Sequence, residues 1–589
     1  MPAPRLLIGP LLRRVVGTRA TVWVETNAPA VVTVRTAGGA AGSAPTFSAY
    51  DHHYALVVVE GLTPDSATSY EVLLDGEVAW PVRESGFPAS VIRTRAADDR
   101  DQPVRLIFGS CREATQHATT RRLPPDALDA YARRLMADPD PAGRPDLLML
   151  LGDQVYADVT SPTVRKLLKR RRRRPKDAPA TQVVSFDEYT KLYLESWRDP
   201  EIRWLLSTVP SVMIFDDHEV IDDWNTSASW RADMRRQPWW AERIRSGLAS
   251  YWVYQHLGNL SPDEIADDPL YAKVVTAEDA TDVLREFGER VDAEADEVHD
   301  TEQSWSSAPD CGARSAHWTR SPGRVRSYQW SYALDLGRTR LVMLDNRCSR
   351  VLQPGNRAML PPGEWAWFLD RAHGVYDHLV VGASLPWLLP PGIHHVEAWN
   401  ERLADSRRPW LAKLSEQLRR ASDLEHWGAF SRSFEALGAL FARLGSGAPG
   451  GTGERVGAGP AYAPPASISV LSGDVHHSYV ARARFDDPSV RTPVHQLTCS
   501  PIHNQVPAGM RPLMKLGWSP GPAAATRALA RSAGVRRPTV RWRKLAGPYF
   551  GNAVATLTHT GRAAEVLIEG TTGDGHLREV ARQRLAGGN

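Results

Sequence analysis

Side chains that bind metal ions or move protons follow directly after short apolar segments in this sequence. Gly152-Asp153-Gln154-Val155-Tyr156 follows residues 147–151, and Asp216-Asp217-His218-Glu219 follows residues 212–215. Apolar segments at 104–108, 341–344, 379–381 and 468–471 lead to the remaining polar groups, which are Ser110-Cys111, Asp345-Asn346-Arg347, Ser384 and Asp474-Val475-His476-His477. This recurrence predicts one site assembled from pieces that are distant in sequence.

The apolar segments themselves predict the fold class. They are too short for helices and rich in Val, Ile and Leu, which is typical of buried strands. In open α/β sheets, ligands collect at the carboxyl ends of the strands. We therefore expect an α/β fold in which these strand ends meet at one edge and carry the site.

The acidic and phenolic groups indicate a metal centre. Asp153 and Tyr156 offer a carboxylate and a phenol, hard oxygen ligands suited to Fe(III) and similar ions. A carboxylate alone at a strand end often caps a helix instead. Residues 216–223 contain five acidic groups, which would repel one another strongly behind a buried strand unless a cation lay among them.

Histidine and cysteine add softer ligands to the same row. A lone buried histidine is usually a hydrogen-bonded core residue, but His476 and His477 together after Asp474 favour ligation. A buried free cysteine usually only packs. Because Cys111 stands in the same row of strand ends, packing and ligation are equal alternatives for it.

Length and composition exclude several classes of protein. A chain of 589 residues predicts two to four domains. A net charge of +3 is too small to imply a nucleic-acid or anionic-membrane partner, and no apolar run is long enough to span a membrane. Four cysteines without CxxC spacing predict neither a disulfide framework nor a zinc ribbon.

The first residues contain a pair of arginines that invites comparison with a twin-arginine export signal. After Arg13-Arg14, however, Arg19 and Glu25 interrupt any continuous apolar region. We therefore expect residues 1–26 to be part of the folded protein, and the protein to be cytoplasmic.

The pattern of turns and periodicities predicts two domains. Alternating strands punctuated by Gly, Pro and Asp predict an N-terminal β-sandwich over 1–98, and Gly61-Leu62-Thr63-Pro64 with Tyr70 resembles a corner of fibronectin type III modules. The remaining residues, 103–589, should form the α/β domain, with a covering helix at 126–137 and a closing hairpin within 553–569.

Two insertions interrupt that domain. Residues 225–330 and 398–466 read mostly as helices, and the Gly/Ala/Pro-rich stretch 445–466 predicts a mobile loop. The basic run Arg170–Arg174 is interpreted as a solvated loop, because it lacks the interleaved aromatic residues of a nucleic-acid site.

The order of the motifs resembles that of a known family, the alkaline phosphatase D-like (PhoD-like) metallophosphatases. The resemblance covers most of 104–505, and the flanking pieces Leu360 to Phe368 and Cys499-Ser500-Pro501 agree with it. The motifs that carry it are Ser110-Cys111, Gly152-Asp153-x-x-Tyr156, Asp216-Asp217-His218-Glu219, Asp345-x-Arg347 and Gly473-Asp474-Val475-His476. Each motif is weak by itself, but five in the right order make the match specific.

The resemblance implies a calcineurin-like core of two mixed sheets flanked by helices, preceded by a fibronectin-III-like sandwich. It also implies hydrolysis of small-molecule phosphoesters, monoesters or diesters, by a metal-activated hydroxide. The implied metals are Fe(III) and Ca²⁺ in a dinuclear or larger site, with Mn²⁺ or Zn²⁺ as alternatives. By motif position the implied ligands are Cys111, Asp153 as the bridging carboxylate, Tyr156, Asp217, Asp222, Asp474 and His476.

Three further residues are candidates for contacting the phosphate. His218 could donate a proton to the leaving alkoxide or orient the phosphate. Arg347 or Arg112 could hold the nonbridging oxygens in bidentate fashion. For Arg347 a structural salt bridge with Asp345 is an equal alternative.

Other classes of function fit the sequence less well. The G-x-S-x-G match at Gly517–Gly521 follows no buried strand, and Pro520 removes a backbone N–H that a serine hydrolase needs for its oxyanion hole. The family often has Asn-Asn where this chain has Asp222-Asp223. That departure leaves the metal identity open and keeps a catalytically inactive metallophosphatase-fold binding protein as the alternative function.

Overall fold

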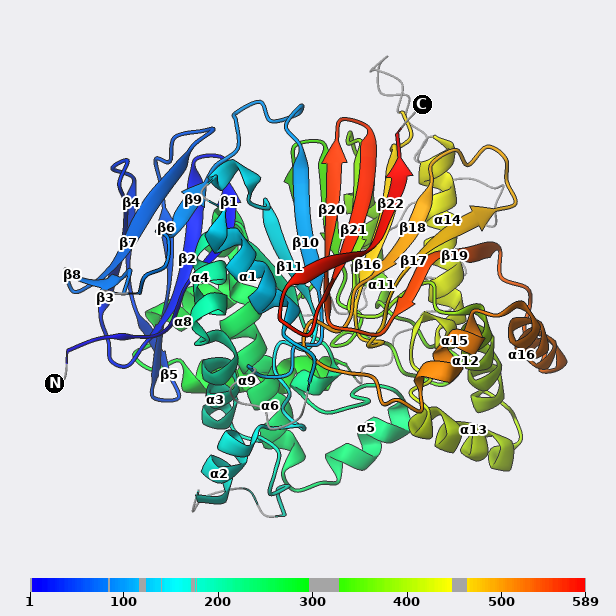
Figure 1. The fold of residues 1–589 in the computed structure, drawn as a ribbon. Helices are drawn as coiled ribbons and strands as arrows, with labels where there is room; N and C mark the ends of the chain where they lie inside the picture. Colours follow the sequence, from blue (N-terminus) through cyan, green and yellow to red (C-terminus); the bar gives the residue numbers. More distant parts are fainter. Residues whose placement is uncertain are drawn as a thin grey trace.

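A β-sandwich and two larger facing sheets organise this protein in the computed structural model (Figure 1). The structure describes residues 3–82, 85–115, 123–138, 140–170, 175, 177–295, 328–447 and 463–587. Within these residues the fold is mixed α/β, as the apolar segments predicted.

The N-terminal residues form two antiparallel sheets. One has the strand order β1-β2-β6-β5, and the other has β4-β3-β7-β8 with β9 paired to β7. Alternate residues such as Val22, Val24, Val32 and Val34 point between the sheets and make a separate hydrophobic core. The strands are β1 Leu6–Val16, β2 Arg19–Thr26, β3 Val31–Thr36, β4 Ala41–Pro45, β5 Phe47–Ala49, β6 His52–Val59, β7 Ala67–Leu74, β8 Glu77–Trp80 and β9 Val91–Arg93.

The first large sheet contains three of the six strands that lead to candidate site residues. Its order is β12-β11-β10-β20-β21-β22; β10, β11 and β12 run parallel, whereas β20 pairs antiparallel with β10. The predicted hairpin is confirmed in β20 and β21, and β22 extends it. The bounds are β10 Val104–Gly109, β11 Leu147–Leu151, β12 Ser211–Ile214, β20 Ala553–Thr560, β21 Ala563–Thr571 and β22 Leu577–Ala586.

The second large sheet contains the other three strands that lead to candidate site residues. Its order is β13-β14-β15-β16-β18-β17-β19, with β14, β15, β16 and β18 parallel. The bounds are β13 Tyr332–Leu336, β14 Thr339–Met343, β15 His378–Gly382, β16 Ser467–Ser472, β17 Ser478–Phe485, β18 Val494–Thr498 and β19 Val540–Tyr549. All six strands predicted from the apolar segments are therefore present, with bounds shifted by a few residues at most.

The two large sheets face each other across a shared apolar core. Phe108 and Met149 from the first sheet pack with Met343 and Leu471 from the second. Helices cover the outer faces: α1, α3, α4 and α6 lie over the first sheet, and α11 and α14 pack against the second (Figure 1). The predicted helix at 126–137 is α1, and Asp126 caps its N-terminus through bonds from the backbone N–H groups of Leu128 and Asp129.

The insertions are helical where the structure describes them. Residues 296–327, 448–462 and 171–174 lie outside the described residues, and they include most of the expected mobile loop 445–466 and most of the basic run. The helix bounds are α1 Ala127–Ala137, α2 Pro162–Arg170, α3 Phe186–Trp197, α4 Pro200–Thr208, α5 Ala228–Arg235, α6 Trp240–Tyr251, α7 Pro262–Asp267, α8 Pro269–Thr276, α9 Thr281–Glu294, α11 Pro362–Ala372, α12 Pro391–Ala404, α13 Pro409–Ala421, α14 Ser431–Ser446, α15 Arg511–Gly517 and α16 Pro520–Ser532. In the part of the chain that is described, no helix combines the length and apolarity needed to cross a membrane.

The sandwich packs directly onto the first large sheet. Arg13 in β1 is fully buried, and its guanidinium donates to the carbonyls of Ser211, Tyr254 and Gln255. The hydroxyl of Tyr70 donates to the carbonyl of Ser207 at 2.6 Å, across the junction. In the structure Arg13 and Tyr70 thus both join the two parts of the molecule.

Candidate metal centre

The ends of β10, β11 and β16 bring three candidate ligands together. The Cys111 thiol, the Asp153 carboxylate and a ring nitrogen of His476 each offer one atom, and these atoms lie within 4.8 Å of one another. Tyr156 joins them, because its hydroxyl lies 3.5 Å from an Asp153 oxygen and accepts a bond from the Asn504 amide at 3.0 Å. The chain therefore places a thiol, a carboxylate, a phenol and an imidazole around one point.

The backbone is strained at the same residues. Cys111, Asp153, Asp474 and His476 all have positive φ angles, of 58°, 54°, 64° and 48°. Each such residue costs on the order of 1–3 kcal/mol and persists only where the surrounding structure fixes it. Their concentration at strand ends supports a functional role for these four positions.

Hydrogen bonds between the strand-end loops fix this geometry. The backbone N–H of Cys111 donates to Gly152 and that of Asp474 donates to the Ser110 hydroxyl, both at 3.1 Å. Gly473 is required here, since a Cβ on it would lie 1.9 Å from the Ser110 oxygen. The loops after β10, β11 and β16 thus form one connected unit.

Glu219 ties the loop after β11 to the loop after β12. Its carboxylate accepts bonds from the backbone N–H groups of Asp153, Gln154 and Asp216 at 3.3, 3.0 and 2.7 Å. Burial raises the pKa of Glu219 to about 7, and these hydrogen bonds oppose that rise. The glutamate of the acidic motif therefore positions backbone, a role that the sequence analysis did not assign.

Asp153 is a fully buried carboxylate in the centre of the site. Burial raises its pKa well above the ordinary value, and the neighbouring Asp216, Asp217 and Glu219 raise it further, opposed by His218. One of its oxygens has no hydrogen-bond partner among the described residues. A buried carboxylate with an open oxygen and acidic neighbours is stabilised by a bound cation.

Asp217 lies between two groups of possible ligands. It joins Asp153 and His218 in one cluster, and Asp216 and Asp474 in another, each within 4.8 Å. Its carboxylate oxygens accept bonds from the backbone N–H groups of His218 and Asp223 at 2.9 Å each. Asp217 is thus held in place beside Asp153, as the sequence predicted.

His218 is held by a partner that the sequence analysis missed. Its Nδ1 lies 3.0 Å from both carboxylate oxygens of Asp158, and its ring lies 4.7 Å from that of Tyr156. Burial by itself would lower the pKa of His218, but the charge and hydrogen bond of Asp158 raise it well above the usual value. The signal for Asp158 was its position in the same loop as Asp153 and Tyr156.

The two arginines expected to contact phosphate both form ion pairs with carboxylates of the protein. Arg347 is fully buried, and its guanidinium pairs with Asp216, with Glu425 at 2.5 Å, and less closely with Asp217 and Asp474 at 3.4 and 3.6 Å. The salt bridge considered from sequence had the wrong partner, because Asp345 instead accepts the backbone N–H of Arg347.

Arg112 is also buried, and it points away from the ligand cluster. Its guanidinium donates to Asp126 at 2.8 Å and to the Ser196 hydroxyl at 3.0 Å. Arg112 therefore binds protein groups, whereas Arg347 lies beside Asp217 and Asp474, and its Nη2 has no hydrogen-bond partner among the described residues. That either guanidinium holds phosphoryl oxygens stays a prediction.

Asp222 lies at the edge of the site. Its side chain is 64% exposed and sits 3.7 Å from Nε2 of His218, while its backbone N–H donates to Asp158. The structure brings it near His218 but outside the three clusters that contain Asp153, Asp217 and Asp474.

The helical insertion contributes two residues that the sequence analysis did not find. Nε2 of His426 lies 3.0 Å from an Asp474 oxygen, and Nδ1 of the same ring lies 2.8 Å from Glu397. Burial would raise the pKa of Asp474, but the hydrogen bond and charge of His426 lower it below its usual value. No local pattern marks these residues, because they lie on α12 and in the loop before α14.

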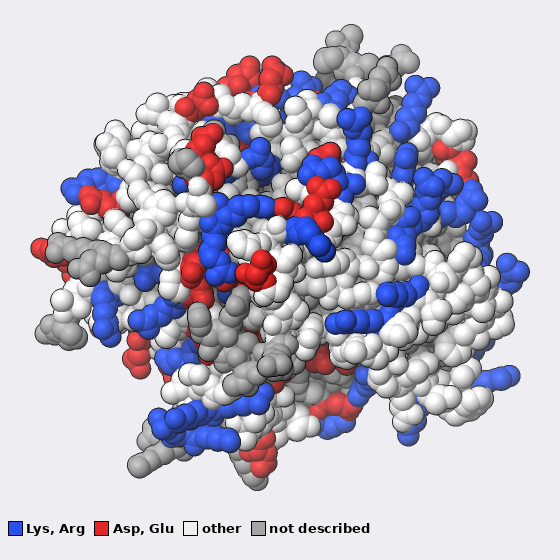
Figure 2. Space-filling model, viewed as in Figure 1, with Lys and Arg blue, Asp and Glu red and all other residues white. Residues whose placement is uncertain are grey.

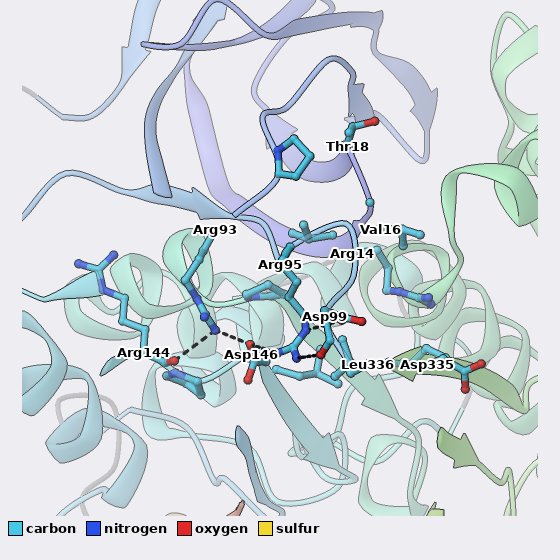
Figure 3. A pocket seen from close by; sticks show the side chains of 18 of the residues that line it. Arg14, Val16, Thr18, Arg93, Arg95, Asp99, Arg144, Asp146, Asp335 and Leu336 are labelled. Carbon is cyan, nitrogen blue, oxygen red and sulfur yellow. Dashed lines mark hydrogen bonds and ion pairs between the residues drawn. The ribbon is translucent and has the colours of Figure 1, made fainter. Parts of the chain in front are cut away.

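A cavity elsewhere has no relation to these groups. It holds about 400 Å³ between the sandwich and the first large sheet (Figure 3). Arg93 and Arg95 converge there on Asp146 at the start of β11, at 2.5 and 2.9 Å. Arg95 also pairs with Asp99, whereas Arg144, which lines the same cavity, has two guanidinium nitrogens without a hydrogen-bond partner among the described residues.

Fold and site together define an α/β protein with a candidate metal centre at the carboxyl edge of two facing sheets. Comparison of the sequence with models of protein families identifies two matching regions. Residues 117–274 match the family of PhoD-like phosphatases, and residues 3–92 match a domain of unknown function, DUF7800. The match confirms the resemblance to PhoD-like phosphatases and supports a hydrolase of phosphoesters.

The structural comparison agrees. A solved structure described as "Structure of PhoD" superimposes with a TM-score of 0.54 and 12% sequence identity, covering 100% of this chain and 94% of the other. At that identity the similarity concerns the fold. No curated protein matches the sequence.

Proposed function

We propose that this protein is a metal-dependent hydrolase of phosphoesters, acting on monoesters, diesters or both. The proposal rests on Asp153, a buried carboxylate in which one oxygen has no hydrogen-bond partner among the described residues. Its carboxylate lies within 4.8 Å of possible ligand atoms of Cys111 and His476 in one cluster, and of Asp217 in another. Bound cations would stabilise the buried negative charge of such a set of donors.

The donor types fit the proposed metals. Cys111, Asp153, Tyr156 and His476 would hold Fe(III), with Asp153 shared between ions. Asp217 and Asp474 would hold a hard divalent cation such as Ca²⁺, with Mn²⁺ or Zn²⁺ as alternatives. When bound, such cations lower the pKa of a water molecule and neutralise charge on phosphoryl oxygens.

Two side chains, His218 and Arg347, would donate a proton and orient the carboxylate ligands. The charge of Asp158 favours the imidazolium form of His218, which places a proton donor beside Tyr156 at a partly exposed position. This imidazolium would hydrogen-bond a phosphoryl oxygen or protonate the leaving alkoxide. Arg347 would fix the Asp216, Asp217 and Asp474 carboxylates and offset their mutual repulsion.

The architecture supports the same assignment. We propose that the two mixed sheets are a calcineurin-like metallophosphatase core spanning 103–589, and that the sandwich over 1–98 is a separate domain. Support comes from the shared core between the sheets, the separate core within the sandwich, and the fold similarity to the PhoD structure.

Metal analysis combined with one substitution tests the function. Protein purified without chelators should contain iron and a second metal, should absorb visible light through the Tyr156 phenolate, and should hydrolyse aryl phosphomonoesters or diesters. Asp153→Asn should lose at least about a hundredfold in activity and much of the bound metal, because a shared ligand is lost. The exposed substitution Asp574→Asn is the matched control.

Two results would contradict the proposal. A protein that contains metal but hydrolyses neither class of ester would favour the alternative, a catalytically inactive binding protein with this fold. Full activity of Asp153→Asn with unchanged metal content would remove Asp153 from the centre.

A further inference from the structure

A surface of exposed apolar side chains lies on helices α15 and α16. Met510, Leu513 and Leu516 are 42%, 57% and 52% exposed, and Leu529 on α16 is exposed as well. Both helices lie at the right of the molecule beside α12, which packs against them and against α13 (Figure 1). We name the exposed faces of α15 and α16 the α15–α16 surface.

Basic residues predominate in the part of the chain that contains α15 and α16. Residues 488–564 contain eleven Lys and Arg residues and no Asp or Glu, although the whole chain has a net charge of only +3. Lys515, Arg531, Arg543 and Lys544 within this stretch are exposed. Figure 2 shows Lys and Arg gathered along the right side of this face, with few Asp or Glu among them. The α15–α16 surface is therefore both apolar and basic.

We propose that the α15–α16 surface docks on an anionic lipid bilayer. Exposed leucines beside lysine and arginine are the combination by which helices lie in the bilayer interface, with the apolar groups among acyl chains and the basic groups at anionic head groups. Among exposed hydrophobic residues, α13 adds Trp410, Leu414 and Leu418 on the neighbouring helix, spaced four residues apart. Such spacing places them on one helical face.

Other occupants fit the chemistry less well. A second copy of the chain would bring two basic surfaces together in a two-fold dimer, where like charges repel. Single-stranded nucleic acid is bound by basic grooves in which several aromatic side chains stack on successive bases. Of the exposed hydrophobic side chains named above, only Trp410 is aromatic, and the others are Met and Leu. The charge and the aliphatic side chains together favour the bilayer.

The surface lies close to the candidate metal centre along the chain. Asn504, whose amide donates to Tyr156, precedes α15, and α12, which carries Glu397 behind Asp474, packs against both α15 and α16. Docking would thus hold the centre near the bilayer. The inference does not depend on the proposed function, because binding needs neither metal nor turnover.

Vesicle co-sedimentation of the full chain tests the inference. The protein should bind vesicles of phosphatidylcholine with 30% phosphatidylglycerol at low salt, bind pure phosphatidylcholine about tenfold more weakly, and dissociate as salt is raised. Leu513→Ser with Leu516→Ser should weaken binding about tenfold, and Lys515→Gln should weaken it less. Val375→Ser, at an apolar side chain that is 89% exposed elsewhere, is the matched control and should bind like the parent.

Several outcomes would overturn the inference. These are no binding to the anionic vesicles at low salt, equal binding to both vesicle types, or unchanged binding of the Leu513/Leu516 variant. A concentration-dependent dimer that the same variant abolishes, without vesicle binding, would instead assign the surface to a second copy of the chain.

Discussion

Asp474 is the residue at which the sheet edge and the helical insertion meet. It follows β16, its backbone N–H donates to the Ser110 hydroxyl after β10, and its carboxylate lies within hydrogen-bond distance of the His426 ring. Glu397 on the far side of the His426 ring completes a carboxylate–imidazole–carboxylate chain. Partners that orient metal ligands in this way tune affinity without touching the metal.

His426→Gln should therefore weaken metal binding by about 10–100-fold while the fold is retained, because Asp474 loses its positioning partner. Competition with a chelator, read by elemental analysis, measures the affinity independently of turnover. His373→Gln, at an exposed histidine on the opposite end of the second sheet, serves as the control. Unchanged affinity in His426→Gln would remove this residue from the site.

At the scale of elements, the site depends on how closely the strand-end loops approach one another. Gly473 after β16 packs against Ser110 after β10, and Gly152 after β11 packs against Asp216 after β12. Glu219 joins the latter pair through backbone hydrogen bonds. The positive φ angles of the ligands are a consequence of chains that turn sharply at these contacts.

Gly473→Ala should lower the free energy of unfolding by about 1–3 kcal/mol and reduce bound metal, because the added methyl group overlaps Ser110. Adding Ser110→Gly should recover part of the loss, since that substitution removes the overlapping atoms. Gly521→Ala on α16, where nothing lies within 4 Å, is the control. Chemical denaturation of the parent and these three variants measures the effect, and no recovery in the double variant would show that the contact is not the cause.

At the scale of the whole molecule, several histidines are buried without charge. Burial lowers the pKa of His256, His394 and His495 to about 3 each. His256 lies within 5.0 Å of the Trp330 ring, and neither of its nitrogens has a hydrogen-bond partner among the described residues. The unfolded chain binds protons at these histidines near pH 6.5, whereas the folded protein does not.

Their contribution to stability is therefore complete above pH 6.5 and declines as the pH falls toward 3. At pH 5 each buried histidine should cost about 2 kcal/mol relative to neutral pH, from 1.36 kcal/mol per pH unit. His256→Phe should reduce the loss of stability between pH 7 and pH 5 by about that amount, measured by urea denaturation at both values. The exposed variant His576→Gln should leave the loss unchanged, and an equal loss in His256→Phe would contradict the assignment.

The sequence alone determined the strands and the row of candidate ligands at their ends, because both depend on local order. Short Val/Ile/Leu runs bounded by turn residues favour buried strands, and a residue directly after a parallel strand lies at its carboxyl edge. Cys111, Asp153, Tyr156, Asp217 and His476 were found in this way, and so was the helix capped by Asp126. The excess of basic residues in 488–564 is also visible in the sequence, although the small net charge of the whole chain does not show it.

Only the tertiary structure decided which groups are partners. The sequence did not show that the guanidinium groups of Arg347 and Arg112 pair with Asp216, Glu425 and Asp126. His426 contacts Asp474, and Glu397 on α12 contacts the other side of the His426 ring, although no sequence motif marks either residue. Pairing of buried charges depends on distances between side chains across the fold, and local order does not encode those distances.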